Sequence, residues 1–221
     1  MGTWLMTGAI VLLSGGIDSA TALYVTKHEK TDIYTMNVTY TETYDREAEA
    51  SRKLAAAAHV KEHVSIFLPF YKDLERRYQP PPSDRISSVY VPARNIVFYG
   101  VAAAYAETLG ADKIVFGSNV DDSKELPDAS LGFIRLMNRL LKIGTRVGQE
   151  GEVIEIVNPL INYTKAEVLK LALQLSVPLE LTWSCHEDGK MPCGRCRGCR
   201  MRVKAFKEIG ARDPLTYAGT S

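Results

Sequence analysis

Short runs of β-favouring residues alternate with longer helical patterns along most of the chain, and this alternation limits the possible folds more than any other feature. Hydrophobic runs predict strands over residues 9–13, 32–40, 62–67, 113–116 and 153–157. Helical spacing predicts helices over residues 18–27, 48–58 and 92–109, and a further helix from Thr164, where Glu167 completes a capping-box pattern. Strands separated by such helices form parallel βαβ units. The sequence therefore predicts an α/β fold with a doubly wound, mostly parallel sheet that binds ligands at the carboxyl ends of its strands.

Charge is balanced along the chain, with 27 Lys and Arg residues against 26 Asp and Glu residues. A hydrophobic content of 46% excludes a disordered protein, and the net charge of +1 argues against nucleic acid or an anionic membrane as a partner. No apolar run approaches the length of a membrane span, and the first seven residues lack the basic residues of a secretory signal. We expect a cytoplasmic protein, and the sequence leaves a homodimer open.

Two segments interrupt the alternation of strands and helices. Residues 79–91 contain three successive prolines, and residues 119–129 are rich in Asp. We expect both to be active-site loops, because binding residues are concentrated in loops on a rigid scaffold.

The segment between the first predicted strand and helix, Ser14-Gly15-Gly16-Ile17-Asp18-Ser19, carries the strongest chemical signal. Paired glycines allow backbone N–H groups to approach an anion closely, the serines add hydroxyl donors, and the helix N-terminus adds further N–H groups. These features predict a polyphosphate cradle, although the motif matches neither the Walker loop nor the dinucleotide-binding loop. A carboxylate beside phosphates would repel them, so we expect Asp18 either to bind Mg²⁺ or to cap the helix.

All four cysteines lie near the end of the chain, as Cys185, Cys193, Cys196 and Cys199. Their C-x7-C-x2-C-x2-C spacing suits a tetrahedral Zn²⁺ ion, and an iron–sulfur cluster is the alternative. Four thiolate ligands would leave no open coordination position, so we expect a structural zinc ion that organises a C-terminal tail. Basic residues outnumber acidic ones in this tail, which offsets the negative charge of a zinc–thiolate site.

Several motifs in a fixed order link the chain to one family. After SGGIDS come VPARN at positions 91–95, PLINYTKAEVLKLA, LTWSCH at positions 181–186, and PCGRCRGC. In these motifs the chain resembles the 7-cyano-7-deazaguanine synthases, the PP-loop ATP pyrophosphatases of queuosine and archaeosine precursor synthesis. The resemblance implies an ATP-dependent carbon–nitrogen ligase that converts 7-carboxy-7-deazaguanine and ammonia to the nitrile. It also implies a PP-loop ATP-binding domain over residues 1–180 and a zinc-binding region over residues 181–221.

The resemblance also implies roles for individual residues. Catalytic roles fall to Asp18 and Arg94, whose guanidinium could bind a carboxylate or a phosphate through two hydrogen bonds. The residues implied to bind ATP with Mg²⁺ are Leu13, Ser14, Gly15, Gly16, Ile17, Asp18, Ser19 and Ala20. Those implied to bind substrate are Tyr40, Arg94, Asn95, Asp122 and Asp128.

Three departures from the family pattern keep alternatives open. The family's YPDCR reads LPDAS here, its DYGQxH segment is reduced to Tyr40 within VTYTETY, and the usual Tyr after TWSC is His186. A paralogue acting on a related deazapurine is therefore one alternative. A tRNA-thiolating PP-loop enzyme is a second, although zinc bound to all four thiolates would leave no cysteine to carry sulfur. A nucleotide-binding sensor without turnover is a third.

Overall fold

A computed structural model of the chain describes residues 6–29, 31–40, 46–81, 86, 90–187 and 189–218. Five parallel strands form one sheet in the order β3-β2-β1-β4-β5. The strands are β1 (Ala9–Leu12), β2 (Ile33–Thr39), β3 (Glu62–Phe67), β4 (Lys113–Val115) and β5 (Glu155–Val157). The predicted doubly wound α/β fold is confirmed. Its strand order reverses between β1 and β4, and open α/β sheets bind ligands at such a switch point.

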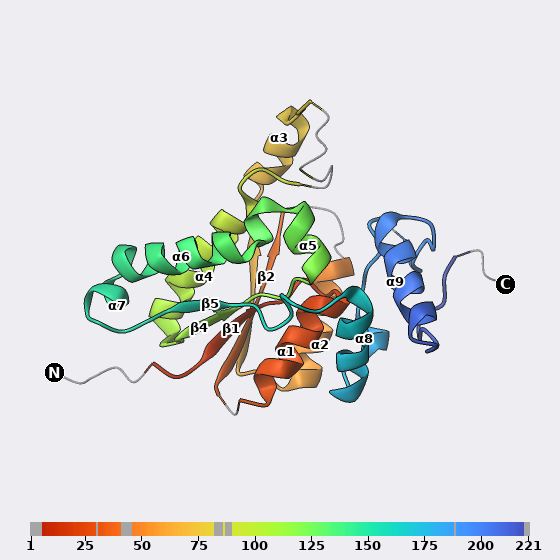
Figure 1. Cartoon of the computed structure of the whole chain (residues 1–221), viewed down its shortest axis with the longest axis horizontal. Coiled ribbons are helices and arrows are strands. Elements are labelled where there is room, and N and C mark those ends of the chain that lie inside the picture. Colours follow the sequence, from red (N-terminus) through yellow and green to blue (C-terminus); the bar gives the residue numbers. More distant parts are fainter. Residues whose placement is uncertain are drawn as a thin grey trace.

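Helices connect the strands and cover both faces of the sheet (Figure 1). They are α1 (Ile17–Lys27), α2 (Arg46–Ala58), α3 (Phe70–Arg77), α4 (Arg94–Leu109), α5 (Val120–Glu125), α6 (Leu131–Gly144), α7 (Arg146–Gln149), α8 (Lys165–Gln174) and α9 (Arg197–Glu208). Two short 3₁₀ helices are η1 (Pro127–Ala129) and η2 (Leu179–Leu181). The sequence analysis located α1, α2, α4 and α8 but missed α3, α6, α7 and α9.

The sheet separates two hydrophobic cores because successive side chains of a strand point to opposite faces. Ala9 and Val11 of β1 join one core, which α1, α2 and α8 cover. Ile10, between them, joins the other core, which α4 and α6 cover. Helix α6 was missed although its buried residues Ile134, Met137 and Leu141 follow helical spacing.

The prediction that residues 119–129 form an active-site loop was wrong in its local structure. They form α5 and η1. The Asn119 side chain accepts hydrogen bonds from the N–H groups of Asp121 and Asp122, and the Asp122 carboxylate accepts one from the Asn119 N–H. This reciprocal capping box begins a helix in a segment whose polar composition indicated a loop.

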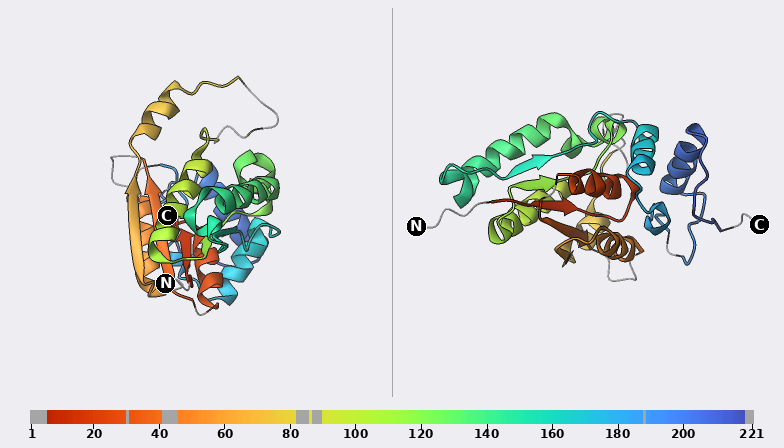
Figure 2. Two further views of the ribbon diagram at one scale, coloured as in Figure 1. Left: turned by 90° about the vertical axis from the view of Figure 1, so that its left-hand side faces the viewer. Right: turned by 90° about the horizontal axis from the view of Figure 1, so that it is seen from below.

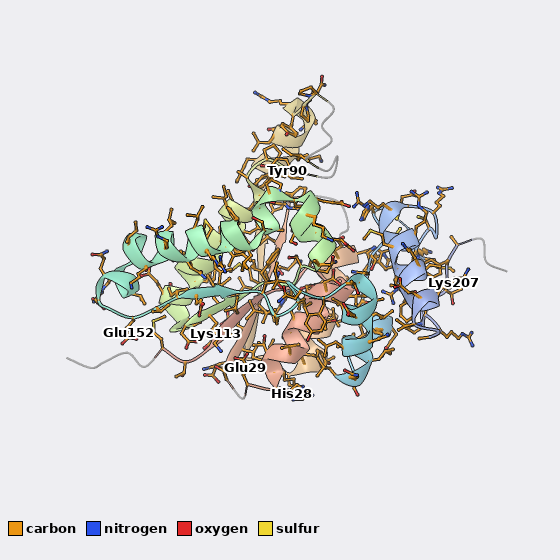
Figure 3. The ribbon with its side chains drawn as sticks, in the orientation of Figure 1. His28, Glu29, Tyr90, Lys113, Glu152 and Lys207 are labelled. Carbon is orange, nitrogen blue, oxygen red and sulfur yellow. The ribbon has the colours of Figure 1, made fainter. Side chains whose placement is uncertain are left out.

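The other predicted loop, residues 79–91, lies partly outside the described residues. Before it, α3 projects from the rest of the fold beyond the carboxyl end of β3 (Figure 2). The ring centroids of Tyr78 and Tyr90 lie 6.3 Å apart, and Tyr90 lies near the base of this projection (Figure 3). At the amino ends of the strands, the Lys113 ammonium pairs with the Glu29 carboxylate (Figure 3). Among the described residues, no helix combines the length and hydropathy of a membrane span.

Helix α9 is attached to the α/β fold through Arg202, whose side chain is 1% exposed. The guanidinium donates to both carboxylate oxygens of Asp213, at 2.8 and 2.9 Å. It also donates to the Thr182 hydroxyl at 2.6 Å and to the Leu179 carbonyl at 3.0 Å. Because the buried guanidinium is shared between η2, α9 and the chain after α9, it fixes the C-terminal region against the sheet domain.

Candidate phosphate-loop and cysteine sites

The predicted phosphate loop leaves β1 at the switch point of the sheet and runs directly into α1. Gly15 has a φ of +90°, and a Cβ atom there would lie 2.5 Å from the Glu47 carbonyl oxygen. The loop therefore packs against α2 in a conformation that only glycine fits. The Ser14 and Ser19 hydroxyl oxygens lie 3.0 Å apart, and the first turn of α1 offers N–H groups that have no partner within the helix. This arrangement is that of an anion cradle.

Asp18 lies in the first turn of α1, but it does not cap the helix. The N-cap is Gly16, and the capping alternative for Asp18 was wrong. Instead, one Asp18 carboxylate oxygen lies 2.6 Å from the Lys165 ammonium, and the other accepts a hydrogen bond from the Asn119 amide at 3.0 Å. The side chains of Lys165 and Asp18 are 22% and 16% exposed. Residues that begin α8 and α5 thus meet at the phosphate loop.

The Asp122 carboxyl is a second acidic group near Asp18, Lys165 and Asn119. Burial and the nearby negative charge of Asp18 raise the pKa of the Asp122 carboxyl. Asn119 connects the two, because its side chain both caps α5 and donates to Asp18. The predicted substrate residue Asp122 therefore lies on the phosphate side of the site. Two carboxylates held close together are suited to a divalent cation.

A cavity of about 230 Å³ opens beside the phosphate loop at the carboxyl ends of β1, β2 and β4. Its apolar walls are formed by Leu12, Leu13, Met36, Val38, Phe98 and Phe116. Its polar lining consists of Ser14, Ser19, Tyr40, Glu47, Arg94 and Asn95. The predicted substrate residues Tyr40, Arg94 and Asn95 are thus brought together with two serines of the phosphate loop. The cavity is below the range of about 300 to 1,000 Å³ that is usual for drug-sized ligands, so it suits a smaller ligand.

The beginning of α4 positions Arg94. The preceding Ala93 has a left-handed backbone with a φ of 53°. The Asn95 N–H donates to the Asp128 carboxylate at 3.3 Å, and the Asn95 amide donates to the Asp128 carbonyl at 3.1 Å. Both residues are buried. The contacts of Asp128 are thus with the first turn of α4, and Asp128 is not among the residues that line the cavity.

The four cysteines converge at the N-terminus of α9. All four Sγ atoms lie within 4.8 Å of one another, and the pairs Cys193–Cys199 and Cys185–Cys196 are each separated by 3.9 Å. A tetrahedral ion with metal–sulfur distances of about 2.3 Å places its sulfur ligands about 3.8 Å apart. The geometry therefore fits one tetrahedral metal ion.

Backbone donors surround these sulfurs. The Cys185 sulfur accepts hydrogen bonds from the N–H groups of Glu187 and Cys193, and the Cys193 sulfur accepts from Arg195 and Cys196. Such donors stabilise thiolates. Burial raises the pKa values of the Cys185 and Cys199 thiols. Burial also opposes ionisation of Cys196, but the N–H groups of Cys199 and His186 outweigh it and lower that pKa to about 7. A shared cation is what would allow all four to ionise together.

Three polar residues of the phosphate and cavity sites were missing from the predicted site residues: Lys165, Asn119 and Glu47. Lys165 follows the predicted cap Thr164, so its position at the start of a helix was known, but its partner Asp18 was not. Glu47 lines the cavity because α2 packs against Gly15. Asn119 was the first residue of a predicted active-site loop, but no local pattern marked Lys165 or Glu47 as a site residue.

Comparisons with known proteins show which family the chain resembles. A family model described as Queuosine biosynthesis protein QueC matches residues 8–210. The 7-cyano-7-deazaguanine synthase of Acaryochloris marina is 39% identical, over 95% of this chain and 99% of the relative. The corresponding synthase of Thermosynechococcus vestitus is 40% identical, over 95% of both chains.

Among solved structures, the NH3-dependent NAD synthetase from Campylobacter jejuni has a similar fold, with a TM-score of 0.51 and 19% identity over 79% of this chain and 66% of that chain. This likeness concerns the fold alone. The family model and the two synthases, by contrast, match the sequence over nearly its full length. The chain therefore belongs to the QueC family of queuosine biosynthesis proteins.

Proposed function

We propose that this protein is an ATP-dependent ligase that converts 7-carboxy-7-deazaguanine and ammonia into 7-cyano-7-deazaguanine. Membership of the QueC family and the printed names of its relatives support this activity. The observation that carries the proposal is the cavity, which has serines of the phosphate loop and Arg94 in the same lining. A carboxylate held by Arg94 would lie beside bound ATP, as adenylation requires.

The phosphates of ATP would occupy the loop from Ser14 to Ser19. The hydroxyls of these two serines and the N–H groups at the start of α1 would donate to the phosphate oxygens. Lys165, at 2.6 Å from Asp18, would add a positive charge. Mg²⁺, when bound by Asp18 and Asp122, would screen the phosphate charges from the attacking carboxylate.

The substrate base would fill the cavity. Apolar side chains such as Met36 and Phe116 would cover its flat faces, and Arg94 would bind its carboxylate through two hydrogen bonds. We assign the N–H edge of the guanine-like ring to Glu47, because a carboxylate accepts two parallel N–H donors. Asp122 and Asp128 are less suited to this edge, since neither lines the cavity.

The reaction needs two activations because carboxylate and amide oxygens are poor leaving groups. In the first, the substrate carboxylate attacks the α-phosphorus of ATP and releases pyrophosphate, and ammonia then displaces AMP to give the amide. In the second, the amide oxygen attacks the α-phosphorus of another ATP and releases pyrophosphate, and this oxygen then leaves as part of AMP while the nitrogen loses its two protons to solvent and the nitrile forms. Arg94 would hold the reacting group in place, and the apolar walls would keep water from the adenylate.

Zinc is the metal that we propose for the four cysteines. A single ion needs its four sulfur ligands at the corners of one tetrahedron, and the four Sγ atoms here lie within 4.8 Å of one another. A four-iron cluster instead holds each thiolate on a different iron atom. We further propose a cytoplasmic location, where these thiols stay reduced. Metal analysis after anaerobic purification should find zinc without iron, and Cys196→Ser should lose the metal and destabilise the tail. Iron, or full stability after chelation, would contradict the assignment.

Product analysis tests the activity. Mass spectrometry of a reaction with ATP, ammonia and 7-carboxy-7-deazaguanine should detect the nitrile together with AMP. Arg94→Lys should reduce the rate strongly because a lysine cannot form the two-pronged contact, whereas Arg135→Lys, at an exposed position of α6, serves as the matched control. AMP formation without nitrile would indicate a different acyl acceptor. Nitrile formation at the wild-type rate by Arg94→Lys would remove Arg94 from the site.

A further inference from the structure

One short segment connects the phosphate loop to the four cysteines. The backbone N–H of Trp183 donates to the Gly15 carbonyl oxygen at 2.8 Å. The indole Nε1–H of the same residue donates to the Cys185 carbonyl oxygen at 2.9 Å. Trp183 also packs against the buried cluster of Cys185, Cys199 and Tyr217. A single residue thus contacts both the phosphate loop and the proposed metal site.

The hydrogen bond to Gly15 orients a donor of the phosphate cradle. The Gly15 carbonyl and the Gly16 N–H belong to one trans peptide group, so they point in opposite directions. Because Trp183 holds the carbonyl on the outside of the loop, the Gly16 N–H faces inward. It lies 3.4 Å from the Ser14 hydroxyl oxygen, within the loop. A change at Trp183 would therefore rotate an N–H group of the proposed phosphate cradle.

Helix α2 holds the other side of this arrangement. Gly15 packs tightly against the Glu47 carbonyl, as its φ and the close approach show. The Arg46 guanidinium carbon lies 5.7 Å from the centroid of the Trp183 ring, and Arg46 Nε donates to the Gly189 carbonyl at 3.1 Å. The phosphate loop is thus held between α2 and the Trp183 segment, and Arg46 joins these two supports.

We propose that Trp183 is a positioning residue that couples metal binding at the four cysteines to nucleotide binding at the phosphate loop. A metal ion fixes Cys185, the Cys185 carbonyl fixes the indole, and the Trp183 backbone fixes the Gly15–Gly16 peptide. Coupling between two binding sites is reciprocal, so bound nucleotide strengthens metal binding by the same factor. The proposal rests on the proposed function, because that function identifies the nucleotide as ATP and the metal as zinc. Its test does not need the nitrile-forming reaction.

Tryptophan fluorescence gives a direct readout. The chain has two tryptophans, so Trp4→Phe leaves Trp183 as the sole reporter. Titration of the zinc-loaded protein with an α,β-methylene analogue of ATP should change the Trp183 emission, and chelation should weaken the binding of this analogue. Emission that does not respond to the analogue, or equal affinity with and without zinc, would overturn the coupling.

Trp183→Phe separates positioning from loss of the tail. It keeps an aromatic ring and removes the Nε1–H donor, so zinc should remain bound while the analogue binds about fivefold more weakly, the effect of one hydrogen bond. In steady-state kinetics, the KM for ATP should rise more than kcat changes. Thr108→Val is the matched control, since it also removes one donor, from an exposed hydroxyl of α4 that donates to the Ala104 carbonyl at 2.8 Å. Its ATP KM should stay at the wild-type value.

Reciprocity supplies a second measurement. Competition between the protein and a chromogenic chelator should show tighter zinc binding when the ATP analogue is present, and Trp183→Phe should remove most of this gain. Equal zinc affinity with and without the analogue would refute the proposal even if nitrile formation is normal. Conversely, coupling between zinc and the analogue in a protein that forms no nitrile would overturn the proposed function and leave this inference standing.

Discussion

Gly117 follows β4 and packs closely against the first turn of α1, and its replacement by alanine tests the proposed site. A Cβ atom at position 117 would lie 2.7 Å from the Asp18 carbonyl oxygen and 3.0 Å from the Ser19 Cα. Both atoms belong to the backbone of α1, so no side chain can rotate away. Since ordinary contacts begin at 3.4 Å, the start of α1 must retreat by about 0.7 Å.

The expected loss of activity follows from this displacement. A shift of about 1 Å in a reacting group costs about a hundredfold in rate, so Gly117→Ala should lower kcat/KM by several tens of times. The overpacking should lower the free energy of unfolding by about 1–3 kcal/mol, which leaves the protein folded. Steady-state AMP release and urea denaturation measure the two effects separately.

Gly100→Ala is the matched control, because a Cβ atom at this exposed position of α4 meets no atom within 4 Å. Alanine there should raise stability by about 0.5–1 kcal/mol through its higher helix propensity and leave activity unchanged. If Gly117→Ala retained wild-type kcat/KM, the contact between Gly117 and α1 would not position the phosphate loop, and the reasoning would fail.

Three further predictions concern single side chains. Asp18→Asn should abolish AMP release while thermal unfolding stays close to wild type, and unchanged turnover would remove Asp18 from the nucleotide site. Arg202→Met should lower the free energy of unfolding by about 3–5 kcal/mol because it leaves the Asp213 side chain, only 10% exposed, without its guanidinium partner, and combining it with Asp213→Asn should recover part of the loss in urea denaturation. Burial, followed by the charge of Arg52, lowers the pKa of His63, so the folded state favours the neutral imidazole. The contribution of His63 to stability should therefore be complete above the ordinary histidine pKa of about 6.5. It should fall as the pH drops below that value. Denaturation of wild type and His63→Asn at several pH values checks this, since the variant should lose that part of the pH dependence.

The order of elements could be predicted largely from sequence because strand and helix patterns depend on near neighbours. The five strands and the helices α1, α2, α4 and α8 were located within a few residues. The segment 119–129 was misassigned because its Asp-rich composition resembles a loop, while the reciprocal hydrogen bonds of Asn119 and Asp122 begin a helix. Helix α6 has an evident apolar stripe and could have been found by the same periodicity.

The candidate sites also differ in whether their residues are close together or far apart in the sequence. The sequence by itself was enough to predict the phosphate loop and the cysteine cluster, because the residues of each lie within a short stretch whose spacing suits the expected ligand. Only the tertiary structure brought Asn119 and Lys165 to Asp18, across 101 and 147 residues of chain. It also joined Trp183 to Gly15. Such contacts depend on strand order and on how helices pack at the switch point between β1 and β4, and no local pattern encodes the packing partner of a side chain.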